Sequence, residues 1–456
     1  MTLGFRYLWV DRYCIPQDDE QEKNHQIRNM NLVYRNSTLT VIAAAGDGPH
    51  AGLPGINDTP RSTQLKSAHI GADTIVYMAN CIFSPTIKRS KWNSRAWTFQ
   101  EGLLAKRRMV FTETQVYFQC QEAHCWEIID AEPGMLEASS TLNIPGHDAG
   151  FIFFLPFHVA NSDDLIFDYF GKDISFVEDA LNALTGVFSH LIERAEQSVH
   201  VLSGLILDPS IFVYDTEDSW RPEESIGWEL AMCYALNWEA IRGIKRRDYF
   251  PSWTWAGWTK AQADASITFQ LSSPRLKPFI ETRARVTVGR QVGHDIHWDT
   301  LENLDWATSD CQITAQYLRV SAWVFDAITM ASSTGISLER FSRIGEDTFG
   351  LTQDVALTLP IGSKVLGLIL YEEYATNWGG SRPHHRIHYI FLTLSYRKVD
   401  SNVSCPCYER IGQGYLKLSM TEIGEEERDD ESGHSWDYKT SLPDLLGARQ
   451  DTVHIL

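Results

Sequence analysis

A carboxylate and an aromatic residue stand four positions apart in the stretch SRAWTFQEGLL, residues 94–104. They are Glu101 and Trp97, and the apolar positions around them predict an amphipathic helix. A carboxylate fixed in a cleft with little water can stabilise positive charge that develops in a transition state. Two simpler roles remain open for Glu101: pairing with a nearby cation, or favouring the helix start electrostatically. The cations close to it in sequence are Arg95, Lys106 and Arg107.

Two further acidic residues follow predicted strands. Asp11 comes directly after the run FRYLWV, and the turn Gly46, Asp47 and Gly48 follows LTVIAAA. In open α/β sheets, ligands bind beyond the carboxyl ends of the strands. We therefore expect Asp11, this turn and Glu101 to converge on a ligand at one edge of a parallel sheet. The structural alternatives are that Asp11 caps the loop after its strand and that Asp47 is an ordinary turn residue.

The elements that would position these residues predict an α/β domain over residues 1–130. A strand over 5–10 and a strand over 39–45 flank a helix whose acidic start suits the amide ends there. Strand, helix and strand are typical of a parallel pair with a right-handed crossover. The apolar stripe of that helix is Ile27, Met30 and Tyr34. Later in the domain we expect a strand within 73–83 and a strand pair around the turn Thr112–Gln115.

Two more regions follow. Residues 150–260 form a mixed helical middle, in which Ser175 and Glu178 have the spacing of a capping box. This region ends in PSWTWAGW, where period-two alternation would place Trp253 and Trp255 on one face of a strand, most simply as a buried plug. Residues 275–456 are rich in alternating strands and turn residues, which predicts a mostly antiparallel sheet or barrel.

Composition narrows the function classes. The formal net charge of −19 disfavours a nucleic-acid partner, because such a surface repels phosphate backbones. Eight cysteines without framework spacing are typical of reduced thiols in a cytoplasmic protein, and none of their clusters completes a metal site. The chain start lacks a secretory signal, and the longest apolar run, residues 149–160, is too short to span a membrane. Motifs of serine hydrolases, zinc proteases and nucleotide-binding loops are absent.

The N-terminal region closely resembles the heterokaryon incompatibility (HET) domain of filamentous fungi. The motifs that carry this resemblance are LWVD, CIPQDD, IRNMNLVY, the glycine-rich turn after LTVIAAA, and RAWTFQE. It covers residues 5 to about 130, and weaker similarity extends over 175–260. The family domain usually begins with one more strand, and here that first strand is missing upstream of LWVD. The resemblance implies a role in non-self recognition and programmed cell death, with other proteins of the incompatibility system or self-association as partners.

A more distant similarity concerns TIR domains, whose W-x-x-x-E signature matches the spacing of Trp97 and Glu101. It implies a TIR-like, flavodoxin-like parallel sheet and, in members that cleave NAD, a catalytic glutamate at the Glu101 position. The similarity then implies that Trp97, Asp11 and the turn Gly46–Gly48 contact the ligand, and that NAD is a substrate, with no cofactor bound. Three hypotheses result: cell-death signalling through protein association, NAD hydrolysis through Glu101, and an inactive truncated paralogue.

Overall fold

The computed structural model describes part of the chain, in two compact units. The first unit comprises residues 1–157 and 172–191, and the second comprises residues 158–171 and 192–456. The described residues are 4–62, 66–70, 73–77, 83–120, 124–127, 162–194, 199–208, 224–241, 243–261, 265–269, 279–282, 284–291, 294–296, 315–332, 335–338, 349–351, 360–377, 384–398, 406–419 and 447–456. The apolar run 149–160 lies outside them. The three-region division of the chain stays a prediction.

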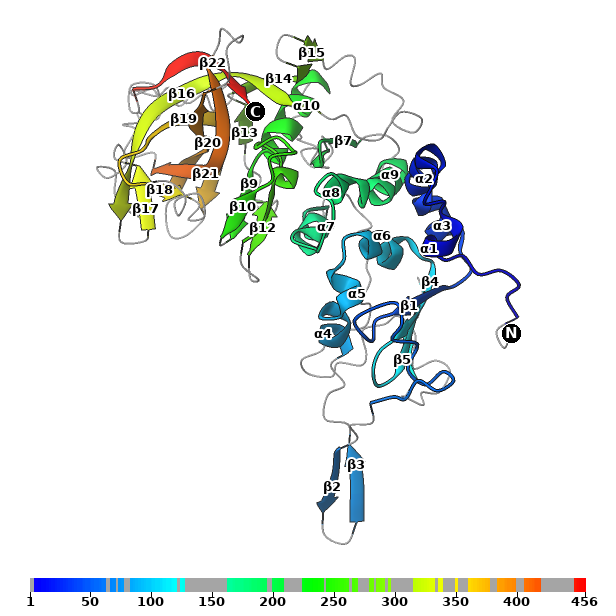
Figure 1. The fold of residues 1–456 in the computed structure, drawn as a ribbon. Coiled ribbons are helices and arrows are strands. Elements are labelled where there is room, and N and C mark those ends of the chain that lie inside the picture. The colour runs from blue at the N-terminus through cyan, green and yellow to red at the C-terminus, as the bar shows by residue number, and fades with distance from the viewer. Residues whose placement is uncertain are drawn as a thin grey trace, which may run out of the picture. The chain divides into compact units, whose positions relative to one another are not determined.

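Three helices begin the first unit: α1 (Asp11–Cys14), α2 (Glu20–Arg28) and α3 (Met30–Asn36) (Figure 1). The side chain of Asp19 caps α2 by accepting from the backbone N–H groups of Gln21 and Glu22. Of the expected apolar stripe, Met30 and Tyr34 on α3 are buried, whereas Ile27 on α2 is only partly buried. The strand expected over 5–10 is wrong, because residues 4–10 form no regular element. Residues 5–10 were expected to pair in parallel with the strand predicted over 39–45, and another segment occupies that place.

That segment is β4 (Arg107–Phe111), which pairs in parallel with β1 (Thr40–Ala43). The sheet order is β1-β4-β5-β6, and its other pairs, with β5 (Val116–Cys120) and β6 (His124–Trp126), are antiparallel. The prediction of a parallel sheet therefore needs correction: the described sheet has one parallel pair. The tight turn Thr112–Gln115, closed by the Thr112 N–H to the Gln115 carbonyl at 3.0 Å, makes β4 and β5 neighbours as expected. A separate hairpin joins β2 (Lys66–Ile70) and β3 (Asp73–Tyr77).

Helices α4 (Phe83–Lys88), α5 (Lys91–Ser94) and α6 (Trp97–Leu104) precede β4. A buried cluster joins α4 and α5 to the sheet; its members are Ile42, Ala44, Ile87, Trp92, Val110 and Tyr117.

Residues 172–191 return to the same unit and add α8 (Asp179–Asn182) and the first part of α9 (Thr185–Arg194). Gly186 lets α9 approach α3 and α6 closely, since an added Cβ would meet Asn31 Cβ at 2.5 Å and Gln100 Oε1 at 2.6 Å. The apolar side chains Leu181, Leu184, Phe188 and Leu191 of this segment are buried. The capping box is wrong: Glu178 precedes α8 without a side-chain cap, because Ser175 lies in a bend before it.

The second unit contains α7 (Ser162–Tyr169), α10 (Glu224–Ala235) and three short strand pairs. The pairs are β7 (His200–Leu202) with β8 (Leu205–Leu207), β9 (Trp238–Ile241) with β12 (Ser266–Phe269), and β10 (Ile244–Arg246) with β11 (Trp258–Lys260). Trp253 and Trp255 are fully buried, but the strand expected for them is wrong. Trp255 begins a 3-10 helix, η3 (Trp255–Gly257), because Thr254 caps that turn and the Trp255 indole donates to the Gly204 carbonyl at 2.8 Å.

The C-terminal part is a large β-structure, as expected. Its order is β13-β19-β20-β21-β22-β16-β14-β15, and β16 also pairs with β19, so five strands close into a ring (Figure 1). Every described pair in it is antiparallel except β21–β22, which confirms the mostly antiparallel prediction. Its strands are β13 (Phe279–Thr282), β14 (Ala284–Gln291), β15 (His294–Ile296), β16 (Tyr317–Ser332), β17 (Gly335–Leu338), β18 (Phe349–Leu351), β19 (Lys364–Asn377), β20 (His384–Arg397), β21 (Cys407–Ser419) and β22 (Arg449–Ile455).

Candidate functional site

Glu101 lies at the middle of α6 with its carboxyl turned into the protein. Its Oε2 accepts a hydrogen bond from the indole Nε1 of Trp92 at 3.2 Å. Burial raises the pKa of Glu101 to about 7, and the Trp92 hydrogen bond opposes this rise by favouring the carboxylate. A pKa raised this far above the ordinary glutamate value is unusual.

Three further groups share this neighbourhood. The Asp11 carboxylate raises the pKa of Glu101 and the Arg95 guanidinium lowers it. Tyr34, from α3, is buried, and burial raises the pKa of its hydroxyl, with contributions from Glu101 and Asp11. Trp9 packs edge-on against the Tyr34 ring, with centroids 5.9 Å apart. Segments that are far apart in sequence thus bring Asp11 and Glu101 within electrostatic reach of each other.

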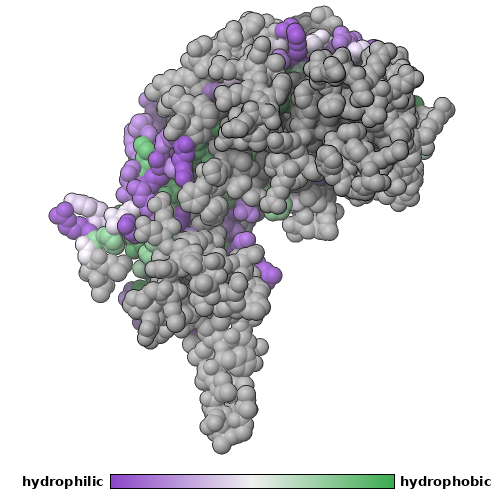
Figure 2. Space-filling view, turned by 180° about the vertical axis from the view of Figure 1, so that it is seen from behind, coloured by the Kyte–Doolittle hydropathy of each residue, from purple (hydrophilic) through white to green (hydrophobic). Residues whose placement is uncertain are grey.

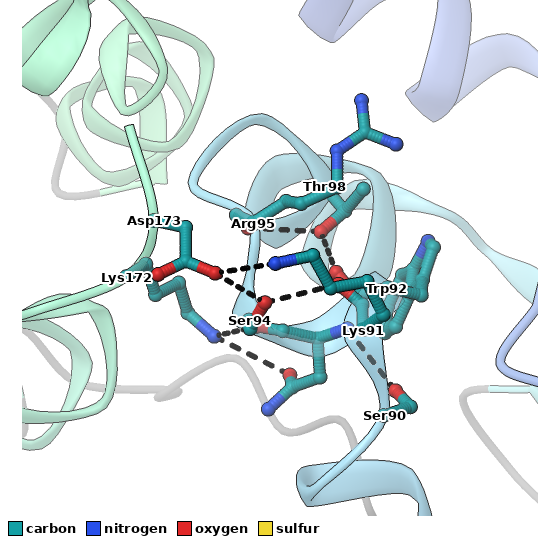
Figure 3. Close-up of polar contacts among 9 residues, drawn as sticks. Ser90, Lys91, Trp92, Ser94, Arg95, Thr98, Lys172 and Asp173 are labelled. Atoms are coloured by element: carbon teal, nitrogen blue, oxygen red, sulfur yellow. Dashed lines mark hydrogen bonds and ion pairs between the residues drawn. The ribbon is translucent and has the colours of Figure 1, made fainter. Parts of the chain in front are cut away.

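A tight corner between α5 and α6 sets the geometry of the Trp92–Glu101 pair. Ser90 caps α5 by accepting from the Asn93 N–H at 3.1 Å, and Arg95 ends α5 in an extended conformation. The Thr98 hydroxyl donates back to the carbonyls of Trp92 and Arg95. Figure 3 shows these bonds converging on the corner. The indole and the carboxyl meet because the chain reverses between them.

The far end of α6 is fixed by a buried arginine. Arg108, from β4, donates through Nε to the Gly102 carbonyl and through Nη2 to the Leu103 carbonyl at 2.8 Å. These carbonyls belong to the last turn of the helix, where no intrahelical partner exists. Burial lowers the pKa of Arg108 to about 10.

The glycine turn, Gly46, Asp47 and Gly48, follows β1 and is open to solvent. Gly46 has φ +77°, where a side chain would be strained and would also collide with the side chain of Ala51. Among the described residues, no recorded contact or charge effect links Asp47 with Glu101, so the structure gives no support for its convergence on the same site.

Trp97, the aromatic residue of the W-x-x-x-E spacing, is the first residue of α6 and is partly exposed. The tryptophan that binds Glu101 is Trp92, which no sequence pattern indicated, and Tyr34 was expected only as part of an apolar stripe. Spacing could not reveal the role of either one, since Trp92 stands nine positions before Glu101 on another helix. The assignment of Glu101, Asp11, Trp97 and the turn Gly46–Gly48 as catalytic or ligand contacts stays a prediction.

Chemically, this arrangement can do two things. The carboxylate of Glu101 can stabilise a cation in a place that water reaches poorly, or its protonated form can donate a proton near neutral pH. Within the described ranges, no three histidine, cysteine or acidic side chains gather as metal ligands, and Cys14 and Cys233 are thiols without a disulfide. No helix in the described part of the chain has the length and hydrophobicity to cross a membrane.

The first part of the chain matches a known protein family. Residues 1–101 match the family model described as heterokaryon incompatibility protein (HET). The matched segment ends at Glu101 and thus includes α1 to α5, the start of α6, and Asp11, Tyr34 and Trp92. The search of curated proteins and the search of solved structures found no match.

Proposed function

We propose that the protein acts in fungal non-self recognition and programmed cell death by associating with other proteins or with itself, because residues 1–101 match the family model described as heterokaryon incompatibility protein (HET). The observation that carries the association is an exposed apolar segment at the start of the domain. Tyr7 and Leu8 are 87% and 80% exposed, and Phe5 and Tyr13 are exposed as well. Large apolar side chains grouped in this way mark surfaces that bind other proteins.

Figures 1 and 2 show how this segment lies. It runs away from the helices as an extended stretch towards the N-terminus in Figure 1. In Figure 2, seen from behind, hydrophobic and hydrophilic groups project together at the left edge of the view. The segment stays attached at Trp9, which packs on Tyr34.

The edge of the small sheet offers a second means of association. Within the described residues, β1 pairs on one side only, with β4, and Val41 on β1 is 40% exposed. An unpaired strand edge can accept an added strand through main-chain hydrogen bonds. This feature supports protein association as the mode of action.

Expression in a filamentous fungus tests this proposal. We expect the wild-type chain to arrest growth and the double variant Tyr7→Ser/Leu8→Ser to lose that effect. Ile361→Ser is the matched control, since Ile361 is an exposed apolar residue of the second unit and 66% accessible. Equal toxicity of the double variant and the wild type would contradict the role of this segment, and normal growth with the wild type would favour the inactive paralogue.

NAD hydrolysis is the second candidate, and the environment of Glu101 favours it. A carboxylate at this position would stabilise the ribosyl cation while the bond from ribose C1′ to the nicotinamide nitrogen breaks and water adds to C1′. Asp11, whose charge acts on Glu101, would contact the ribose. Similarity to TIR domains is limited to the spacing of Trp97 and Glu101, so this activity rests on the site and not on the fold.

Purified protein incubated with NAD tests this candidate by nicotinamide release. We expect release from the wild type to rise with pH through about 7, because the carboxylate form is the active one and burial raises the Glu101 pKa to about 7. Glu101→Gln should abolish release, whereas Glu113→Gln, which changes an exposed carboxylate of the same unit, should retain it. Absence of nicotinamide release by the wild type removes this candidate.

A further inference from the structure

Two residues far beyond the matched segment hold the corner that carries the candidate site. The backbone of Asp173 forms a parallel bridge with Arg95: its N–H donates to the Ser94 carbonyl at 2.6 Å, and its carbonyl accepts from the Ala96 N–H at 3.0 Å. Its carboxylate accepts from Lys91 Nζ at 2.9 Å and from the Ser94 hydroxyl at 2.7 Å. Figure 3 shows both contacts meeting at one carboxylate.

Lys172 adds contacts on the neighbouring residues. Its ammonium donates to the backbone carbonyl of Asn93 at 2.7 Å and to the Asn93 side-chain oxygen at 3.3 Å. The same ammonium lies 5.1 Å from the centre of the Phe99 ring, on α6. One dipeptide therefore binds the end of α5, the connection and the beginning of α6.

The corner matters because the two partners of the site stand on opposite sides of it. Trp92 belongs to α5 and Glu101 to α6, and their 3.2 Å hydrogen bond exists only while the two helices keep their angle. Each helix is short, at 4 and 8 residues, so neither is stable by itself. External contacts must hold the angle.

We infer that Lys172 and Asp173 are positioning residues, which hold the Trp92 indole against the Glu101 carboxyl by fixing the corner between α5 and α6. The geometric part of this inference is independent of any activity; its catalytic meaning rests on the NAD hydrolysis proposed above. It follows that residues 1–101 contain Trp92 and Glu101 but not Lys172 and Asp173, the residues that hold them in position.

The side-chain contacts of Asp173 contribute little to stability, because Lys91 and Asp173 are 51% and 60% exposed. Removing contacts that only add a little stability would therefore leave the pKa of Glu101 unchanged. If these contacts position the corner, their removal raises the pKa of Glu101, since the carboxylate then loses the Trp92 hydrogen bond that opposes the effect of burial. Among the residues that the structure describes, Asp11, Arg95 and Tyr34 interact electrostatically with Glu101, and none of them is changed in the test below.

The test uses the full chain with ¹³C-labelled glutamate, and the Glu101 signal is assigned by its loss in Glu101→Gln. In the double variant Lys172→Met/Asp173→Ala we expect the titration midpoint of Glu101 to rise by about one pH unit, while the denaturation midpoint stays nearly unchanged. Glu178→Ala is the control, because it removes an exposed carboxylate from the same connecting segment without touching the corner.

An unchanged Glu101 midpoint in a folded double variant would overturn the inference. A double variant that no longer folds is replaced by Asp173→Asn, which keeps Lys172 and a side-chain oxygen that can accept from Ser94 but removes the charge that binds Lys91. Nicotinamide release is measured separately. A wild type that cleaves no NAD refutes the enzymatic candidate and leaves the titration result to decide the positioning role.

Discussion

At the scale of single residues, Glu101 is governed by the opposition between burial and one indole hydrogen bond. Burial raises its pKa to about 7 and the Trp92 N–H lowers it. A group whose folded-state pKa lies above its unfolded value binds protons more tightly in the folded state. The unfolding free energy contributed by Glu101 therefore falls as the pH rises from about 4.5 to about 7, and it is constant above that range.

Glu101→Gln should remove this pH dependence. The glutamine side chain stays neutral at every pH, so the stability of the variant relative to the wild type should increase by about 1–3 kcal/mol between about pH 4.5 and about pH 8. Urea denaturation at a series of pH values measures the difference. Glu113→Gln, on an exposed carboxylate, should leave the wild-type profile unchanged, and a constant difference between Glu101→Gln and wild type would refute the raised pKa.

Trp92→Phe separates the indole from the rest of the pocket. The ring stays apolar but loses its N–H, so the pKa of Glu101 should rise above its wild-type value by about one unit. The ¹³C titration of Glu101 measures this. Trp97→Phe is the matched control, because no hydrogen bond from the Trp97 indole to Glu101 is recorded among the described residues; a shift of similar size in both variants would contradict the assignment to Trp92.

At the scale of elements, α6 is a short helix that is fixed at both ends by other parts of the chain. Lys172 and Asp173 hold its beginning, and the Arg108 guanidinium binds the carbonyls of its last turn. Local propensity contributes little to such a helix, and tertiary contacts decide its position.

Arg108→Met should destabilise the first unit by about 2–4 kcal/mol, because two buried carbonyls lose their charged donor. Arg107→Met is the control one residue away on the exposed face of the same strand, and its effect should stay within about 0.5 kcal/mol. Chemical denaturation of both variants gives the comparison. Equal small effects would show that water replaces the guanidinium at the helix end.

At the scale of the whole molecule, each of the two units has its own core. In the second unit, Arg410 of β21 is buried and donates through Nη1 to the Leu236 carbonyl at 2.7 Å and through Nη2 to the Trp238 carbonyl. Its guanidinium carbon lies 3.8 Å from the centre of the Trp238 ring. Burial lowers the pKa of Arg410 well below its ordinary value. One side chain thus joins the β-ring to the beginning of β9 and to Leu236 just before it.

Arg410→Met should cost the second unit about 3 kcal/mol or more, because the bonded carbonyls stay buried without a donor. Hydrogen exchange should speed up in peptides around residues 236–238 and 407–413 and stay unchanged in residues 4–62. Arg449→Met is the control in the same unit: its ion pair with Asp326 at 2.6 Å is exposed and worth about 0–1 kcal/mol. Faster exchange in residues 4–62 of the Arg410 variant would show that the units do not unfold independently.

Sequence patterns were most reliable where burial repeats along one element. The stripe with Met30 and Tyr34, the β4–β5 turn and the long C-terminal strands all follow from local periodicity. The same patterns gave wrong predictions where the conformation of a segment depends on contacts with residues distant in sequence. Residues 5–10 have the composition of a strand and form none, and PSWTWAGW has the alternation of a strand but turns at Trp255, because a hydrogen bond to a distant carbonyl favours that turn.

The sequence by itself determined the resemblance of the N-terminal segment to the HET domain, the helix around Trp97 and Glu101, the turn between β4 and β5, and the β-rich character of the C-terminal part. Only the tertiary structure decided which tryptophan binds that glutamate, that Asp11 lies near it, and that residues 172–191 complete the unit. The physical reason is that periodicity records which side of one element is buried. The charge state of Glu101 depends instead on burial and on donors from other elements, and those distances exist only in the folded chain.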